Sequence, residues 1–165
     1  MKNIIVILIL FVSGCAQLKP KDLPLSGEII SSGIYEPYGE HTYLNTPDST
    51  MRYSSEYDGF RLISSNQEIT AVEGITLGIE YRLRGKPNKN YKVELLIEHP
   101  PMTRPDGTIS TRSLIPLSVT MDENGYDRNF IMYSITEPYE KVSGDWAFKL
   151  LSSHNMILSK IIVTK

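Results

Sequence analysis

The stretch GITLGIEYRLRG, residues 74–85, alternates between apolar and polar side chains, and this alternation decides the fold class. Its apolar positions are Ile75, Leu77, Ile79, Tyr81 and Leu83. Its polar positions are Thr76, Glu80, Arg82 and Arg84. Because successive side chains of a β-strand point to opposite faces of a sheet, this pattern predicts a strand with one buried face and one wet face.

A second stretch with the same period follows, NYKVELLIEHP at residues 90–100. Its apolar row consists of Tyr91, Val93, Leu95 and Ile97, and His99 continues that row. Between the two stretches, GKPNKN at residues 85–90 supplies Gly, Pro and Asn, which favour a reversal of the chain. We therefore expect the two strands to form a hairpin whose apolar rows face one core.

Shorter segments with strand-like alternation continue along the chain. They lie at residues 27–36, 60–64, 115–121, 128–135, 145–153 and 156–165. Asn124-Gly125 and residues 153–155 supply reversals between neighbouring segments. Residues 45–58 have no clean period, which predicts a long loop, and no long amphipathic helix is expected in this part of the chain.

Residues 25–165 are therefore predicted to form an all-β domain. Short strands with frequent turns favour an antiparallel immunoglobulin-like β-sandwich of about seven to nine strands. A small β-barrel is the alternative. Trp146 shares a face with Phe148 and Leu150, so we expect it in the core.

The N-terminus differs from the body of the chain. Lys2 precedes an apolar run from Ile4 to Val12, which is about half of the roughly 20 residues that a membrane-spanning helix needs. The run fits the core of a signal peptide over residues 1–14. The sequence Val12-Ser13-Gly14-Cys15 that ends it resembles the bacterial lipobox, and Cys15 is the only cysteine of the chain.

The lipobox resemblance implies that the chain is cut before Cys15 and that this residue carries acyl chains. Two or more acyl chains hold a protein stably on a membrane, so we expect a lipid anchor followed by a flexible tether over residues 15–24. Ala16, in place of the aspartate that retains lipoproteins at the inner membrane, implies the periplasmic face of the outer membrane. With a net charge of −2 the chain has no basic excess, and no nucleic-acid partner is expected.

One stretch, HPPMTRPDG at residues 99–107, is a candidate binding loop. Its prolines stiffen the backbone, which lowers the entropic cost of binding a partner. The residues that it presents are His99, Pro100, Pro101, Arg104 and Asp106. The alternative is structural: the prolines end a strand cleanly, and His99 is a satisfied histidine at the rim of the core.

Tyrosines form a second set of candidates. The triplet Glu-Pro-Tyr occurs at residues 36–38 and again at 137–139. Flat phenolic rings beside carboxylates bind glycans or protein partners, which makes Tyr38, Tyr43 and Tyr139 candidate contacts. The alternative is that these rings fold back on the rim of the sandwich.

Sequence motifs of catalysis are lacking. The histidines have no metal-ligand spacing, and no nucleophile elbow or phosphate-binding glycine loop occurs in the sequence. We therefore predict no catalytic residue, no metal and no cofactor.

Three motifs resemble a bacterial family of secreted domains of unknown function. They are GIYE at residues 33–36, HPP at 99–101 before the Asp-Gly turn, and VSGDWAFKL at 142–150. The resemblance implies an immunoglobulin-like sandwich and export, and it transfers no catalytic residue.

The sequence as a whole predicts a lipid-anchored, non-enzymatic envelope protein that binds another envelope protein or a glycan. One alternative is an inhibitor module that inserts the loop at 99–107 into the cleft of an enzyme. Another is a small periplasmic envelope hydrolase, which would require His99 and Asp106 to converge with another acid or base in a cleft.

Overall fold

The computed structural model describes residues 24–66 and 68–165. The predicted signal peptide, Cys15 and nearly all of the tether lie outside the described residues. The elements are β1 (Ser26–Asn45), β2 (Tyr53–Ser64), β3 (Glu68–Ile69), β4 (Thr76–Arg84), β5 (Asn90–Thr103), β6 (Ile109–Thr120), β7 (Tyr126–Ser134), the 3₁₀ turn η1 (Pro138–Glu140), β8 (Gly144–Ser152) and β9 (Asn155–Thr164). Among the described residues, no helix is long and apolar enough to cross a membrane.

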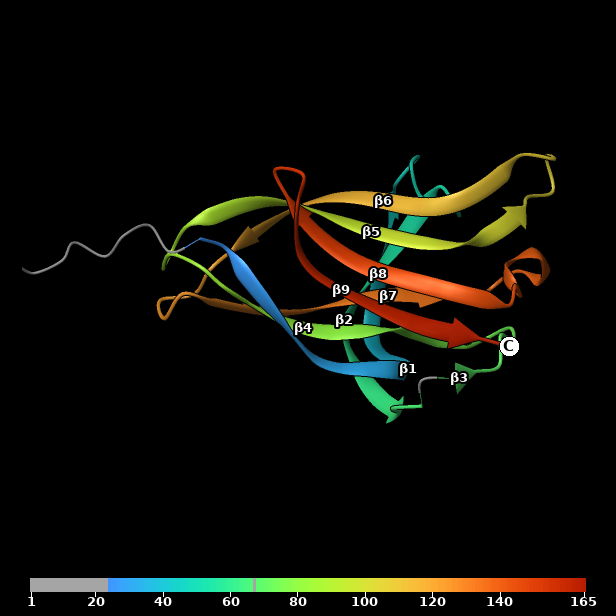
Figure 1. Cartoon of the computed structure of the whole chain (residues 1–165), viewed down its shortest axis with the longest axis horizontal. Helices are drawn as coiled ribbons and strands as arrows, with labels where there is room; N and C mark the ends of the chain where they lie inside the picture. The colour runs from blue at the N-terminus through green and yellow to red at the C-terminus, as the bar shows by residue number, and fades with distance from the viewer. Residues whose placement is uncertain (1–23, 67) are drawn as a thin grey trace, which may run out of the picture.

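The strands form two sheets that pack face to face (Figure 1). A four-stranded sheet has the order β2-β1-β4-β7, and a five-stranded sheet has the order β3-β9-β8-β5-β6. Every paired neighbour is antiparallel except β3, which runs parallel to β9. The all-β sandwich prediction is confirmed, and two separate sheets replace the alternative of a closed barrel.

The core lies between the inward rows of the central strands. In β4 the residues Leu77, Ile79, Tyr81 and Leu83 are completely buried. They face Trp146, Phe148 and Leu150 of β8, which are equally buried. The period-two rows therefore point inward as expected, and Trp146 is a core residue.

The predicted hairpin between residues 75–84 and 90–97 is wrong. Both strands exist, but β4 pairs with β1 and β7, whereas β5 pairs with β6 and β8. The connection at residues 85–89 passes from one sheet to the other, and the Asn124-Gly125 turn does the same between β6 and β7. Turn residues and alternation predict a reversal, but both are equally compatible with strands that face each other across the core.

Two other reversals do make hairpins. Asp106-Gly107 joins β5 to β6, and Gly107 has a positive φ of 81°. Ser153 and His154 join β8 to β9 with φ values of 50° and 66°, and a positive φ at both central residues is the signature of a type I′ turn. These turns match the right-handed twist of the strands on either side of them.

The predicted long loop at residues 45–58 is also wrong, because β1 runs on to Asn45 and β2 begins at Tyr53. Beyond Tyr35, β1 no longer pairs with β4, so Pro37 needs no partner on that side. A bulge follows at Gly39, whose φ is 82° and where a Cβ would overlap the Asp58 carboxylate. We call residues 36–60 the β1–β2 ribbon and residues 46–52 its tip.

The ribbon leaves the four-stranded sheet and reaches the other one. Figure 1 shows its teal end behind β6, far from the blue start of β1. The contact is direct, since Leu114 N of β6 donates a hydrogen bond to Asp48 O of the tip at 3.0 Å. The ribbon therefore crosses the flank of the sandwich where β6 and β7 are the edge strands.

Candidate binding groove

The ribbon tip is fastened to the five-stranded sheet through His99. The Nδ1–H group of His99 donates to Pro100 O at 2.8 Å, which leaves Nε2 to accept from the Thr50 hydroxyl at 2.6 Å. The imidazole also packs against Trp146 and Tyr133, with ring centroids 5.3 and 6.0 Å away. Burial, and to a lesser degree the charge of Arg104, lower the pKa of His99, so the neutral ring is favoured.

Serine hydroxyls complete this fastening. Thr50 N donates to Ser113 Oγ at 2.8 Å, and the Ser110 hydroxyl lies 2.9 Å from Thr50 Oγ1. Thr50, Ser110 and Ser113 are all buried. A hydroxyl–imidazole pair resembles a nucleophile with its base, but here both groups are closed off from solvent, so the network is suited to hold the tip in place.

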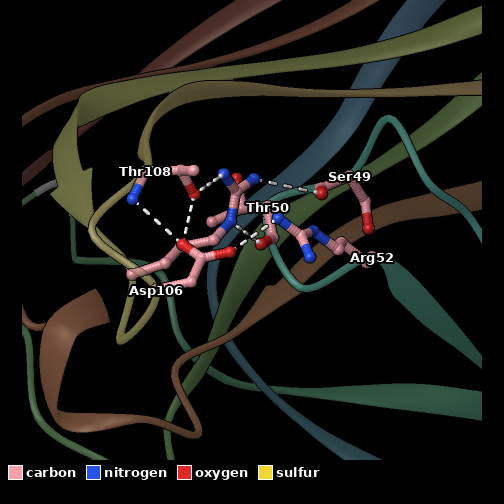
Figure 2. A network of polar contacts seen from close by, with 6 residues as sticks. Ser49, Thr50, Arg52, Asp106 and Thr108 are labelled. Atoms are coloured by element: carbon pink, nitrogen blue, oxygen red, sulfur yellow. Dashed lines mark hydrogen bonds and ion pairs between the residues drawn. The ribbon is translucent and has the colours of Figure 1, made fainter.

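Arg104 forms a second fastening, through Ser49, Thr50 and Thr108, which are labelled in Figure 2. Its Nε donates to Thr50 O at 2.7 Å, and its two terminal nitrogens reach Thr108 Oγ1 at 3.1 Å and Ser49 O at 3.5 Å. The guanidinium therefore joins the turn between β5 and β6 to the ribbon tip. Its donors are directed inward, to groups of the protein itself.

Asp106 lies on the outer side of the same turn (Figure 2). Its carboxylate accepts from Thr108 N at 2.9 Å and from the Thr108 hydroxyl at 2.6 Å, and Arg52 of the tip contacts it at 2.8 Å. The hydrogen bonds from Thr108, and then the charge of Arg52, lower the pKa of Asp106 to about 2. Asp106 is thus an ionised, exposed residue whose partners are Thr108 and Arg52.

The two prolines of the candidate loop lie inside β5, which continues to Thr103 through a register shift between Glu98 and Met102. Pro100 packs against the start of β8, since a Cβ on Gly144 would come within 2.8 Å of Pro100 Cγ. Pro101 is exposed. The loop at residues 99–107 is therefore the end of one strand and a turn bound to the ribbon, and it does not project freely from the sandwich.

The candidate tyrosines take different places. Tyr139 lies in η1, and its hydroxyl reaches Met51 Sδ of the ribbon tip at 3.1 Å. Tyr38 covers Gly59 on the neighbouring strand and remains half exposed. Tyr43 is 64% exposed and lies edge-to-face against Tyr53, with ring centroids 5.5 Å apart.

A cavity of about 600 Å³ lies beneath the ribbon, and we call it the flank groove. The ribbon roofs it with aromatic rings, including Tyr43, Tyr53 and Tyr57. Half-buried side chains of β6, Ile115 and Leu117, form part of the opposite wall. The edge strand β7 contributes further lining from Asp127 to Ser134. The groove is thus an open seam between the edges of the two sheets.

The charged residues that line the groove are acidic. They are Glu56 of the ribbon and Asp127 of β7, and no lysine or arginine is among the lining residues. Asp127 Oδ2 is buried and has no hydrogen-bond partner in the described structure, and the same is true of the Tyr81 hydroxyl. Burial, and then the charge of Asp122, raise the pKa of Asp127, whose own charge contributes to the raised pKa of Tyr81. The groove therefore contains a desolvated acid that its own protein leaves uncompensated.

The groove is not among the features that the sequence predicts. Its signal is the inward row of β7, where Asp127 and Asn129 precede Ile131, Tyr133 and Ile135 at the same period of two. Polar residues at inward positions mark the part of the strand where the core ends. The ribbon, which makes this end a groove, depends on contacts between residues more than 40 positions apart, such as Thr50 and His99.

The arrangement does not form a recognisable catalytic centre. A hydrolase of the expected type would bring His99 and Asp106 together, but His99 is buried against Thr50, whereas Asp106 is exposed and binds Thr108 and Arg52. Within residues 24–66 and 68–165, no group of three or more His, Cys, Asp or Glu side chains is placed to hold a metal ion.

The two packed sheets define a β-sandwich of the immunoglobulin-like class. Residues 25–161 match the family described as "Domain of unknown function (DUF3859)", and the chain belongs to that family. This agrees with the resemblance that the three sequence motifs carry. No curated protein sequence matches the chain.

One of the similar solved structures shares the architecture over most of its length. An immunoglobulin-like protein from Pseudomonas aeruginosa matches with a TM-score of 0.57 and 21% identity, covering 87% of this chain and 94% of that one. The alkylpurine DNA glycosylase AlkC of Pseudomonas fluorescens, bound to DNA, matches with a TM-score of 0.43 and 11% identity over 61% of this chain and 28% of its own. A β-glucosidase from Listeria innocua gives 0.42 and 11% over 62% and 15%. At 21% identity the first match shows the fold alone, and the other two, with TM-scores below 0.5, carry no argument.

Proposed function

We propose that this protein is a lipid-anchored, non-enzymatic protein of the cell envelope that binds another envelope protein in the flank groove. The observation that supports the proposal most strongly is the groove itself, an open seam of about 600 Å³ with aromatic, apolar and acidic lining. Concave, partly apolar sites with a few polar groups are the usual form of binding sites.

The anchor rests on the signal-like N-terminus and Cys15. Ten residues separate Cys15 from the start of β1 at Ser26, and an extended chain of that length spans at most about 35 Å. A domain on such a tether stays close to the membrane and samples the surface around its anchor. With Ala16 after the cysteine, we place the protein on the periplasmic face of the outer membrane.

Cys15→Ser tests the anchor. We expect the variant to lose labelling by a radioactive or clickable palmitate and to leave the membrane fraction, because it lacks the thiol that would carry the acyl chains. Continued fractionation with membranes would contradict the anchor.

Binding is favoured over catalysis because the side chains that could act in catalysis are already hydrogen-bonded to other groups of the protein. The hydroxyl of Thr50 and the imidazole of His99 hold the ribbon tip inside the protein, and Arg104 is bound to backbone oxygens of the same tip. Purified protein is expected to release no fragments from peptidoglycan or from model glycosides. Turnover that is lost in Asp127→Asn or Glu56→Gln would contradict the proposal and favour the envelope hydrolase.

A protein partner is favoured over a glycan because one wall of the groove is the edge of a sheet. β7 has β4 as its partner on one side, and its other side borders the groove. Edge strands offer a row of backbone donors and acceptors to another extended chain, and a glycan has no matching row.

Crosslinking in living cells tests the proposed site. A photo-reactive amino acid at Ser118 or Tyr53, which line the groove, is expected to trap a specific protein. The matched control is Ile161 on β9, which is exposed but does not line the groove. A partner trapped from Ile161 and not from the groove positions would refute this location of the site, and trapped glycan in place of protein would refute the choice of partner.

A further inference from the structure

The free edge of β7 has a definite pattern of backbone groups. Ile135 N donates to Ile75 O at 2.9 Å, and Ile135 O accepts from Gly74 N at 2.8 Å. Because the backbone groups of successive residues in an antiparallel strand point to opposite edges, the odd-numbered residues of β7 face β4 and the even-numbered residues face outward. Arg128, Phe130, Met132 and Ser134 therefore direct their N–H and C=O groups away from the sheet.

Part of this edge is already capped. The Phe130 N–H donates to the side-chain oxygen of Asn129 at 2.8 Å. The N–H groups of Met132 and Ser134 receive no such cap among the described residues. The open part of the edge lies at the end of β7 that borders the ribbon.

The groove has the length of a short strand. Its lining along β7 runs from Asp127 to Ser134, and seven steps of about 3.3 Å make about 23 Å. A segment of that length would lie over Ile115 and Leu117 of β6 and beneath the rings of the ribbon. Its alternate side chains would point into the apolar wall and out to solvent, as those of a regular strand do.

The charge of the groove selects among such segments. Asp127 is the acid at one end of the seam, where its Oδ2 atom is buried without a partner, and Glu56 adds a second negative charge. A cationic side chain would supply the missing hydrogen bond and compensate the charge of Asp127, and Glu56 adds to the negative charge of the groove as a whole. An acidic segment would meet like charge in a partly desolvated site, which is unfavourable.

Resting on the proposed function, we infer that the groove takes an extended, basic segment of a partner protein. The segment pairs with the outward backbone groups of β7 and places a lysine or arginine against Asp127. This is strand addition at a sheet edge, in which main-chain hydrogen bonds provide affinity and side-chain pockets provide specificity.

The test uses the full-length protein in a neutral detergent and fluorescent peptides of alternating valine and threonine. One peptide ends in lysine, and a second ends in glutamate. A third is the lysine peptide with two consecutive central prolines, one of which must fall where an N–H group would face β7. We expect saturable binding of the lysine peptide, which lowers the amide exchange of Met132 and Ser134. Binding of the other two peptides should be at least about tenfold weaker, the scale of one hydrogen bond to a charged group.

Asp127→Asn should remove the preference for lysine over glutamate, whereas Asp145→Asn, which changes an exposed carboxylate of β8, should retain it. Equal binding of the lysine and glutamate peptides, or an unchanged preference in Asp127→Asn, overturns the inference. So does self-association of the protein through β7 that excludes the peptides, because the occupant is then a second copy.

The two proposals fail separately. Partner crosslinks from Ser118 without any lysine-peptide binding would leave the proposed function standing and refute the basic strand. Binding of the lysine peptide without a crosslinked protein in cells would show that the groove takes a basic strand and would refute the proposed envelope partner.

Discussion

The two flanks of the sandwich are built differently. At one flank β1 packs directly on β9, so closely that a Cβ on Gly27 would come within 2.9 Å of Leu158 Cδ2. At the other flank, residues of the edge strands β6 and β7 line a cavity of about 600 Å³. One flank has no space for a methyl group, and the other has space for a ligand.

The difference follows from the unequal sheets. One sheet has five strands and the other has four, and the edge strand β6 of the larger sheet presents Ile115 and Leu117 to the groove. The β1–β2 ribbon crosses to that side, but it is fastened at its tip and leaves the seam below it open. A sandwich of unequal sheets thus has an open groove at one flank, where the ribbon crosses beside β6.

Matched leucine truncations should give the largest contrast. Leu150→Ala on β8 removes a completely buried side chain and should lower the free energy of unfolding by about 2–5 kcal/mol. Leu117→Ala, on the half-buried wall of the groove, should cost less than about 2 kcal/mol. Urea unfolding followed by circular dichroism measures both, and equal losses would show that the groove is packed like the core.

Loss of the tip fastening should have an intermediate effect. Thr50→Val keeps the shape of the side chain but removes the hydroxyl that bonds Nε2 of His99 and the nearby serines. The buried groups left without a partner should lower the free energy of unfolding by about 1–3 kcal/mol. Amide exchange should rise most in residues 46–52. Thr42→Val, at an exposed position of β1, is the control, and similar effects of both changes would refute a special role for Thr50.

The same fastening should make stability depend on pH. His99 has a lowered pKa in the folded protein, where burial and the Arg104 charge disfavour its protonation. The unfolded chain therefore binds the proton first as pH falls below about 6.5. Stability should be complete above that pH and should decline as pH falls toward the folded pKa.

Unfolding midpoints between pH 5 and pH 7.5 test this dependence. The decline should shrink in His99→Gln and persist in His154→Gln, which changes an exposed histidine in the turn before β9. The groups that pack against His99 besides Arg104 are Thr50, Tyr133 and Trp146, none of which changes charge in this range. An equal decline in both variants would assign the effect to other residues.

The smallest expected effect is a slight gain in stability when Asp127 is replaced. Burial raises the pKa of Asp127, so its charged form is disfavoured in the folded protein, and Asp127→Asn should stabilise the fold slightly, by less than about 1 kcal/mol. Asp145→Asn should leave stability unchanged. A clear loss of stability in Asp127→Asn would mean that the carboxylate has a structural partner and is not reserved for a ligand.

Sequence alone was sufficient for the features that depend on local pattern. The inward rows of β4, β5 and β8 followed from alternation, and the turns at Gly107 and at residues 153–154 followed from their residue types. The partners of each strand did not follow, because β4 and β5 share one core whether they lie side by side or face to face. The groove depends on that choice, so it could not be predicted either.

The candidate residues show the same limit. His99 was correctly placed on an inward row, but its partner Thr50 lies 49 positions away, in a segment whose period suggested a loop. The sequence shows Arg104 and Asp106 as polar residues on a stiff turn, but it does not show that the ribbon tip binds both of them. In each case the side chain was visible in the sequence and its partner was not.

Residue-by-residue amide hydrogen exchange along β7 tests the central claim most directly, because the claim is that this strand is an open edge. Ile131 and Tyr133, whose backbone groups face β4, should exchange slowly, and Met132 and Ser134, which face the groove, should exchange much faster. Uniformly slow exchange from residue 131 to residue 134 would show that the edge is already paired, and it would contradict the account.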